Sequence, residues 1–129
     1  EQALREFYTA EESFAYSPEE LTAPGVIFYI ASDAQDTPLG CVASVDMGDY
    51  VEIKRLFVTP PAQGTGLGRA LMARLEKDAR AAGHTLMRLE TGDLLVAACT
   101  LYESMGYRRR GPFADYLDVP TSTFMEKRL

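Results

Sequence analysis

Hydrophobic residues in the first half of the chain form short runs that are bounded by turn-forming residues. The run 26–31 is nearly continuous, which predicts a buried strand. The segments 39–46 and 50–58 flank the turn sequence Met-Gly-Asp and predict an antiparallel hairpin. Similar patterns in the second half predict three further strands, over 85–90, 107–110 and 121–129.

Other segments carry apolar residues at helical spacing. The segment 66–82 has a single apolar stripe and ends before Gly83, a residue type that commonly terminates helices. The segment 94–105 carries a second stripe, and two shorter helices are predicted over 2–12 and 17–21. The stripe of the long helix consists of Leu67, Leu71, Leu75 and Ala79.

This order of elements predicts a fold of the α/β class, more narrowly α+β with a mixed sheet. Helices come first, an antiparallel meander follows, and a strand–helix–strand–helix–strand segment ends the chain. That order implies a mixed, mostly antiparallel sheet flanked by helices. The 129 residues suffice for a single domain spanning 1–129, and no repeat or linker divides them.

Composition and charge exclude some classes of protein but do not identify the function. Hydrophobic residues make up 47% and charged residues 25%, as in ordinary globular proteins. The net charge of −6 argues against a nucleic-acid partner, and no apolar run is long enough to span a membrane. Cys41 and Cys99 lack metal-ligand spacing, so no metal is expected. We interpret both as buried, reduced thiols of a cytoplasmic protein, and a disulfide is the alternative.

The glycine-rich segment 63–69 lies between a predicted strand and the start of the long predicted helix. The first amides of a helix have no partners within it and the helix dipole is positive there, so this arrangement predicts an anion site. The segment lacks the Gly-Lys-Ser/Thr ending of a P-loop, and Arg69 stands where the dinucleotide fingerprint needs its third glycine. A glycine-rich turn that binds no ligand remains the alternative.

The pattern Gln63-x-x-Gly66-x-Gly68 resembles the acyl-CoA signature of the GNAT superfamily of N-acetyltransferases. Two blocks carry the resemblance: residues 52–72, similar to the family's central strand, loop and helix, and residues 97–107, similar to a later helix with Leu-Tyr-Glu before Gly-aromatic. It implies the GNAT fold with acetyl-CoA as co-substrate. Family domains usually begin with a strand, so we expect that strand to be missing here, which leaves an exposed sheet edge.

The resemblance also implies which residues contact the acetyl donor. Backbone groups of Leu56, Phe57 and Val58 would bind the pantetheine arm, which would lie beside the strand. Arg69 would add charge to a phosphate or would be an exposed helix arginine. Gly66 and Gly68 would keep side chains away from the pyrophosphate. The pyrophosphate would be bound by the loop that carries the signature, which consists of Gln63, Gly64, Thr65, Gly66, Leu67, Gly68 and Arg69.

Two residues are candidates for acid–base catalysis. Glu52 lies where a branch of the family carries its glutamate base, and Tyr102 matches the family tyrosine that acts as general acid. The alternatives are a solvated carboxylate paired with Lys54 or Arg55, and a core aromatic. Strand alternation nominally places Glu52, Lys54, Leu56 and Val58 on one face, and a bulge would disturb this after Glu52.

The acceptor is the least determined part of the prediction. Residues 1–24 and 111–120 are variable in the family and acidic here, which suits a cationic amine but is also typical of a solvated surface. We expect a small-molecule amine acceptor, with a peptide or protein amine as second choice, and a homodimer is compatible with the sequence. Leu95 replaces the Asn or Gln of many relatives, which favours the alternative function of a non-catalytic acyl-CoA sensor. His84 and the Arg108–Arg110 run are expected at the surface.

Overall fold

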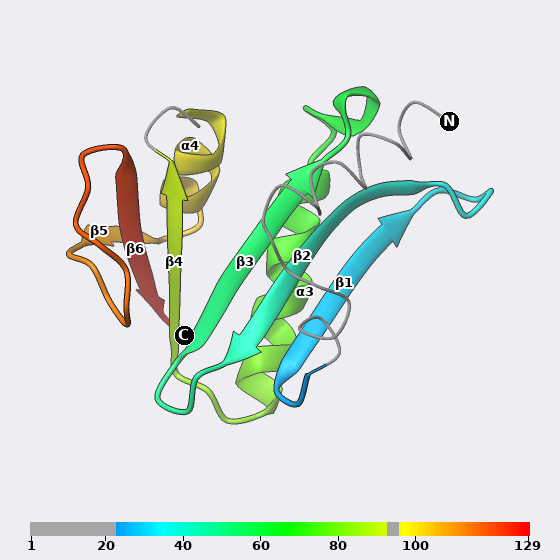
Figure 1. Cartoon of the computed structure of the whole chain (residues 1–129). Helices are drawn as coiled ribbons and strands as arrows, with labels where there is room; N and C mark the ends of the chain where they lie inside the picture. Colours follow the sequence, from blue (N-terminus) through cyan, green and yellow to red (C-terminus); the bar gives the residue numbers. More distant parts are fainter. Residues whose placement is uncertain (1–22, 93–95) are drawn as a thin grey trace.

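The computed structural model describes residues 23–92 and 96–129, and the helices predicted over 2–12 and 17–21 lie outside these ranges. Within them no helix is long and apolar enough to cross a membrane. The elements follow the predicted order (Figure 1): β1 (Val26–Ser32), β2 (Pro38–Asp46), β3 (Val51–Val58), the 3-10 helix η1 (Pro60–Ala62), α3 (Leu67–Ala81), β4 (Leu86–Gly92), α4 (Val96–Ser104), β5 (Arg108–Arg110) and β6 (Ser122–Arg128).

The strands form one sheet in the order β1-β2-β3-β4-β6-β5. Every neighbouring pair is antiparallel except β3 and β4, which are parallel and are connected by α3. The predicted mixed, mostly antiparallel sheet is therefore confirmed. β4 runs past its predicted end because Thr91 and Gly92 pair with Thr123 and Ser122 of β6.

β3 and β4 pair over a short distance and then separate. Only Val51, Glu52 and Ile53 pair with β4, opposite Met87, Arg88 and Leu89. Beyond them β3 contains a bulge: Cys41 faces Phe57 and Ala43 faces Lys54, so one residue of β2 lies opposite Arg55 and Leu56. Arg55 has a φ of 61° at this point. Figure 1 shows the two strands close at one end of the sheet and apart at the other.

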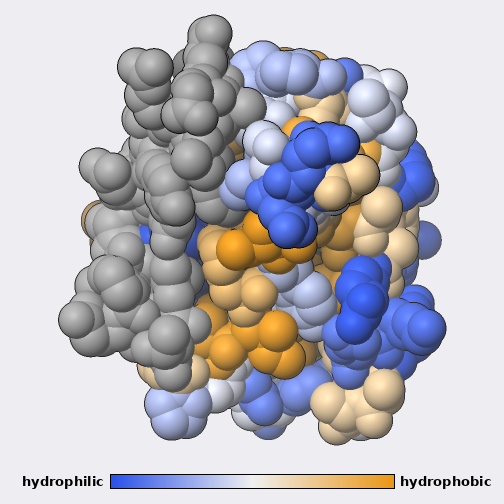
Figure 2. Space-filling model, turned by 90° about the vertical axis from the view of Figure 1, so that its right-hand side faces the viewer, coloured by the Kyte–Doolittle hydropathy of each residue, from blue (hydrophilic) through white to orange (hydrophobic). Residues whose placement is uncertain are grey.

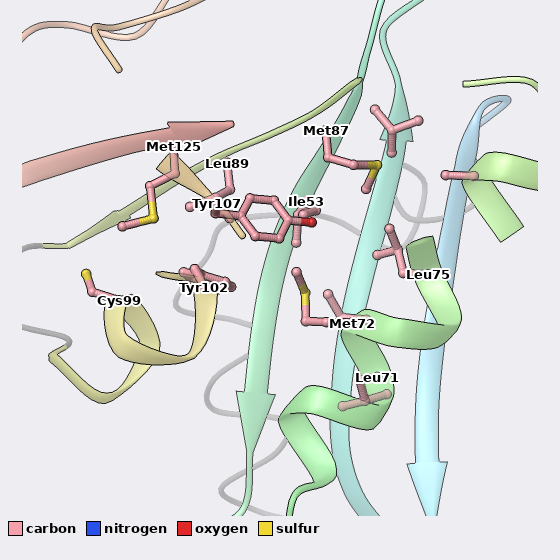
Figure 3. Packing of buried hydrophobic residues seen from close by; sticks show 13 residues of the cluster. Ile53, Leu71, Met72, Leu75, Met87, Leu89, Cys99, Tyr102, Tyr107 and Met125 are labelled. Atoms are coloured by element: carbon pink, nitrogen blue, oxygen red, sulfur yellow. The ribbon is translucent and has the colours of Figure 1, made fainter. Parts of the chain in front are cut away.

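The main hydrophobic core lies between one face of the sheet and the two helices. Leu71, Met72 and Leu75 of α3 meet Ile53 and other inward residues of the strands, as the predicted stripe requires (Figure 3). Tyr102 of α4 and Tyr107 complete this core, with ring centroids 5.9 Å apart in an edge-on arrangement. Both cysteines are buried free thiols, as predicted.

A smaller aromatic cluster covers part of the opposite face. Phe113, in the loop 111–121, packs edge-on against Tyr50 and Phe124 with ring centroids 5.7 and 5.8 Å away. Tyr116 and Leu86 pack against the same cluster. The loop is thereby fixed to the sheet on the face opposite α3.

A buried carboxylate connects α3 to the last strand. Glu76 accepts a hydrogen bond from the Tyr107 phenol at 2.6 Å, and Lys127 Nζ of β6 lies 2.9 Å from Glu76 Oε1. Arg80 Nη2 lies 3.8 Å from the same oxygen. Burial, followed by the bond to Glu76, raises the pKa of Tyr107 well above its usual range, so the phenol keeps its proton. The buried charge is therefore paired.

β1 forms one edge of the sheet and pairs with β2 alone among the described residues. Ile27 and Ile30 on this strand are each 53% exposed. Figure 2 shows the corresponding apolar surface in the middle of that side of the molecule. The missing first strand and the exposed edge expected from the sequence stay predictions, because residues 1–22 lie outside the described ranges.

Tyr107→Phe is expected to lower the free energy of unfolding by about 2 kcal/mol, because a hydrogen bond to a buried charged group is lost. Urea denaturation of both proteins measures the difference. Tyr29→Phe is the matched control, since Tyr29 donates to Asp78 at 2.9 Å and Asp78 is far more exposed than Glu76. Equal losses in the two variants would contradict a special contribution from Glu76.

Candidate active site

The predicted anion site has the geometry of an uncapped helix start. α3 begins at Leu67, and Gly66 precedes it with a left-handed φ of 88° and no side-chain cap. Ala70 is the first residue whose amide bonds back into the turn, to Gly66 O at 3.0 Å. Gly64 is also left-handed, with a φ of 78°, and a Cβ on either glycine would meet no atom within 4 Å. Among the described residues, the start of α3 therefore presents amides without helical partners beside open space, whereas Gln63 N and Thr65 N bond to Pro60 O and Ala62 O.

Gly68 has a packing role, and its expected role toward the pyrophosphate stays a prediction. A Cβ at this position would lie 3.2 Å from Leu101 Cδ2 and 3.7 Å from Val58 Cγ2. The glycine therefore lets α3 approach α4 and the end of β3 closely, and it does not simply leave room for a ligand. Of the three glycines, Gly64 and Gly66 shape the loop backbone and Gly68 allows the packing.

The polar side chains of the loop bond to neighbouring elements. Gln63 Nε2 donates to Val58 O at 3.1 Å and fixes the loop to the end of β3. Thr65 Oγ1 donates to Ala62 O at 2.5 Å. Arg69 Nη2 donates to Ser104 Oγ at 2.5 Å and so connects α3 to the end of α4. The guanidinium of Arg69 is exposed at the helix start, where a phosphate can also reach it.

The bulge in β3 decides which way the following side chains point. Nominal alternation placed Leu56 with Glu52, and that prediction is wrong: Leu56 packs against the helix-face core. The extra residue at Arg55 changes the parity, as the sequence analysis expected of a bulge. Val58 and Phe57 still pair with Gly40 and Cys41 of β2, and among the described residues no strand pairs with 54–58 on the β4 side. That edge is available to an extended ligand.

Glu52 is buried on the face that carries the aromatic cluster. Its side chain lies opposite those of Val51 and Ile53, which point into the helix-face core, and the residue is 2% exposed. Glu52 Oε2 accepts a hydrogen bond from the Tyr116 phenol at 2.5 Å and lies 3.8 Å from Lys54 Nζ. The alternative pairing with Lys54 is therefore present, but the carboxylate is not solvated.

Tyr102 lies on the other side of the sheet, in the core beneath α4 (Figure 3). It is 5% exposed, so the core-aromatic alternative describes its packing correctly. Burial is the main cause that raises the pKa of its phenol above the usual range, followed by Cys99. Tyr102 therefore keeps its proton at neutral pH and can donate it.

Glu52 and Tyr102 thus lie on opposite faces of the sheet. Glu52 is the second of the three residues of β3 that pair with β4, and Ile53, the last of them, lies in the same core as Tyr102. A buried carboxylate and a protonated phenol are groups of the kinds that accept and donate protons in acid–base catalysis.

Charged residues next to the aromatic cluster form a separate ion-pair network. Glu126 Oε1 lies 2.6 Å from Arg110 Nη1 and 3.1 Å from Arg88 Nε. The hydrogen bond from Arg110 is the main cause that lowers the pKa of Glu126. Since the pKa is lower in the folded chain, the network stabilises the fold at neutral pH, and this contribution is lost as the pH falls through the lowered value.

The remaining predicted residues lie away from the site or outside the described ranges. His84 is in the loop between α3 and β4, with Nε2 3.4 Å from Asp46 Oδ2. Arg108–Arg110 form the edge strand β5, as expected. Leu95 lies outside the described residues, so its position relative to the site stays a prediction.

Sequence reasoning missed two residues of the site. Tyr116 was treated only as part of a variable loop, because its bond to Glu52 joins residues 64 positions apart. Gly40 was treated as an ordinary strand residue, but a Cβ there would lie 2.9 Å from Phe57 O and 3.2 Å from Leu67 Cδ2. A glycine inside a predicted strand was the available signal of a close approach.

Comparison with known sequences places the chain in one family. The profile of the acetyltransferase (GNAT) family matches residues 1–107. The IAA acetyltransferase of Azospirillum brasilense is 41% identical over 128 residues, covering 98% of this chain and 83% of the relative. An uncharacterised N-acetyltransferase of Schizosaccharomyces pombe is 32% identical, covering 92% and 74%.

Solved structures agree with this placement. A Klebsiella pneumoniae protein assigned to the acyl-CoA N-acyltransferases superimposes with a TM-score of 0.85 at 34% identity, covering 97% of this chain and 88% of that one. The PaiA N-acetyltransferase of Thermoplasma acidophilum, solved with coenzyme A, shares the fold with a TM-score of 0.77 at 18% identity, covering 99% of this chain and 89% of that one. The chain therefore belongs to the acetyltransferase (GNAT) family, whose members are acetyl-CoA-dependent acyltransferases.

Proposed function

We propose that this N-acetyltransferase moves an acetyl group from acetyl-CoA to the primary amine of a small molecule by direct attack. The observation that supports the proposal most strongly is that Glu52 and Tyr102 lie on opposite faces of the sheet, with Glu52 in the short stretch where β3 pairs with β4. A thioester between the strands would meet a proton acceptor on one side and a proton donor on the other.

The acetyl donor fits the described residues at two places. Free amides at the start of α3, with open space beside Gly64 and Gly66, suit the pyrophosphate of coenzyme A, and Arg69 can add positive charge. The unpaired edge of Leu56, Phe57 and Val58 suits the amide groups of the pantetheine arm. Gln63 bonds to Val58 O and so joins these two places.

Glu52 supplies the general base in this proposal. A primary amine has a pKa near 10 and is mostly protonated at neutral pH, so it must lose a proton before or during attack. The amine nitrogen forms a bond to the acetyl carbonyl carbon while Glu52, directly or through a water molecule, accepts the proton. General bases of this kind typically contribute about 10²–10⁴-fold to the rate.

Tyr102 supplies the general acid. As the carbon–sulfur bond breaks, the electron pair stays on sulfur, and the Tyr102 phenol gives its proton to that sulfur. The phenol is then restored by proton exchange with solvent. Its burial keeps the proton in place until the thiolate develops, because the ionised phenol is poorly solvated in the core.

A small acceptor is the form of substrate that we favour. Glu52 lies beneath the loop 111–121 and is 2% exposed, so the approach to it is narrow. A small amine needs less loop displacement than the amine of a folded protein. A panel of ethanolamine, spermidine, tryptamine, lysine and a short peptide with a free N-terminus distinguishes these acceptors when thiol release from acetyl-CoA is measured.

Glu52→Gln is expected to lower kcat by about 10²-fold or more, because the amide cannot accept the proton. The KM for acetyl-CoA should stay near the wild-type value. Thiol release with the best amine of the panel measures both constants. Glu103→Gln is the matched control, since Glu103 is an exposed residue of α4. Unchanged turnover in Glu52→Gln would show that Glu52 is not the base.

Tyr102→Phe is expected to lower kcat by about 10²-fold while keeping the ring in the core. The loss should be smaller for an acetyl thioester with a more acidic thiol, because such a leaving group needs less help from a proton donor. Tyr29→Phe, which removes a phenol on β1, is the control and should keep full activity. Equal losses for both thioesters would argue for a packing role of the phenol instead.

Gly66→Ala is expected to raise the KM for acetyl-CoA about ten-fold, because alanine disfavours the left-handed backbone that aims the amides at the pyrophosphate. Gly48→Ala is a close control: Gly48 has a φ of 89°, an added Cβ would meet nothing within 4 Å, and it lies in the turn between β2 and β3. If both variants raised the KM equally, general destabilisation would explain the effect.

A further inference from the structure

The surroundings of the proposed base are asymmetric. Two described residues approach the carboxylate of Glu52, and both approach the same oxygen, Oε2: the Tyr116 phenol at 2.5 Å and Lys54 Nζ at 3.8 Å. Within the part of the chain that the structure describes, these contacts give the two oxygens of this buried carboxylate different environments.

The loop that carries Tyr116 is fixed to the sheet independently of this bond. Phe113 is buried among Tyr50 and Phe124, and the Tyr116 ring lies 5.2 Å from that of Phe113 and 5.6 Å from that of Phe124. Tyr116 N also donates to Phe113 O at 3.2 Å. The phenol is thus held over Glu52 by aromatic packing, which a change of its hydroxyl alone leaves intact.

We propose that Tyr116 is a positioning residue for the acetyl transfer: its phenol holds Glu52 Oε2 and leaves Oε1 to accept the proton of the amine. The proposal rests on the role of Glu52 as base. A hydrogen bond from a phenol to one carboxylate oxygen fixes the rotation of the carboxylate. Lys54 cannot replace it, because its nitrogen is beyond ordinary hydrogen-bond distance of Oε2.

Other charged groups near Glu52 are already engaged. Arg88, the register neighbour of Glu52 on β4, is paired with Glu126 at 3.1 Å, and its guanidinium lies 4.5 Å from the centre of the Tyr50 ring. On β2, the register neighbour is the apolar Val45. Among the described residues, Tyr116 therefore makes the closest polar contact with the carboxylate of Glu52.

Tyr116→Phe is expected to lower kcat about ten-fold while the KM for acetyl-CoA stays unchanged, because the carboxylate of Glu52 loses the bond that holds it while the loop keeps its packing. Thiol release measures both constants. Tyr29→Phe removes a phenol–carboxylate bond elsewhere and should change neither constant.

A double-mutant cycle separates this proposal from the proposed function. If Tyr116 acts through Glu52, Tyr116→Phe should cost little further activity in the Glu52→Gln background. Additive losses, or an unchanged kcat in Tyr116→Phe, would overturn the positioning role while leaving Glu52 as base. Full activity in Glu52→Gln would overturn both. Unchanged thermal unfolding of Tyr116→Phe confirms that the loop keeps its packing.

Discussion

The separation of β3 from β4 is the constraint on which the rest of the site depends. Parallel pairing ends after Ile53 and Leu89, and the bulge at Arg55 bends β3 immediately afterwards. One consequence is a run of backbone groups that no neighbouring strand satisfies. Another is that the bulge changes the face of the following side chains, so that Leu56 packs in the helix-face core whereas Glu52 lies on the opposite face.

Glycines allow the long helix α3 to pack closely beside the end of β3. Gly40 on β2 allows close contact with Leu67 and with the backbone of Phe57, and Gly68 allows close contact with Leu101. Gly66 then gives the backbone the sharp turn into α3. Because these positions act together, the positive end of the helix lies beside the free edge of β3. An anion bound there would be close to an extended arm bound along the strand.

Much of the fold was predictable from the sequence because its patterns are local. The strands over 26–31 and 39–46 and the helix over 66–82 follow from apolar runs, a turn and one stripe, and the structure confirms them. The face occupied by Leu56 was not predictable, since the bulge depends on how β2 pairs with β3. The bond between Tyr116 and Glu52 was not predictable either, because it depends on where a long loop folds back onto the sheet.

Some features of the candidate site were also predictable from the sequence, and others were not. The glycine signature and the Leu-Tyr-Glu block pointed to a family from sequence alone, and the comparisons confirm that family. The second function of Gly68, as a contact surface for α4, needed coordinates because it depends on a residue more than thirty positions away. A sequence motif of this kind indicates the function of a loop, but it does not indicate which residues from other parts of the chain contact that loop.

The buried Glu76 has a consequence for the order in which the chain completes its fold. Its closest partners, Tyr107 and Lys127, lie far along the chain, and Lys127 belongs to the final strand. Until that strand is in place, α3 would bury a carboxylate without its nearest cation, which is unfavourable. The native packing of α3 around Glu76 therefore requires β6 to be paired in the sheet, and the free energies that stabilise these two elements are coupled.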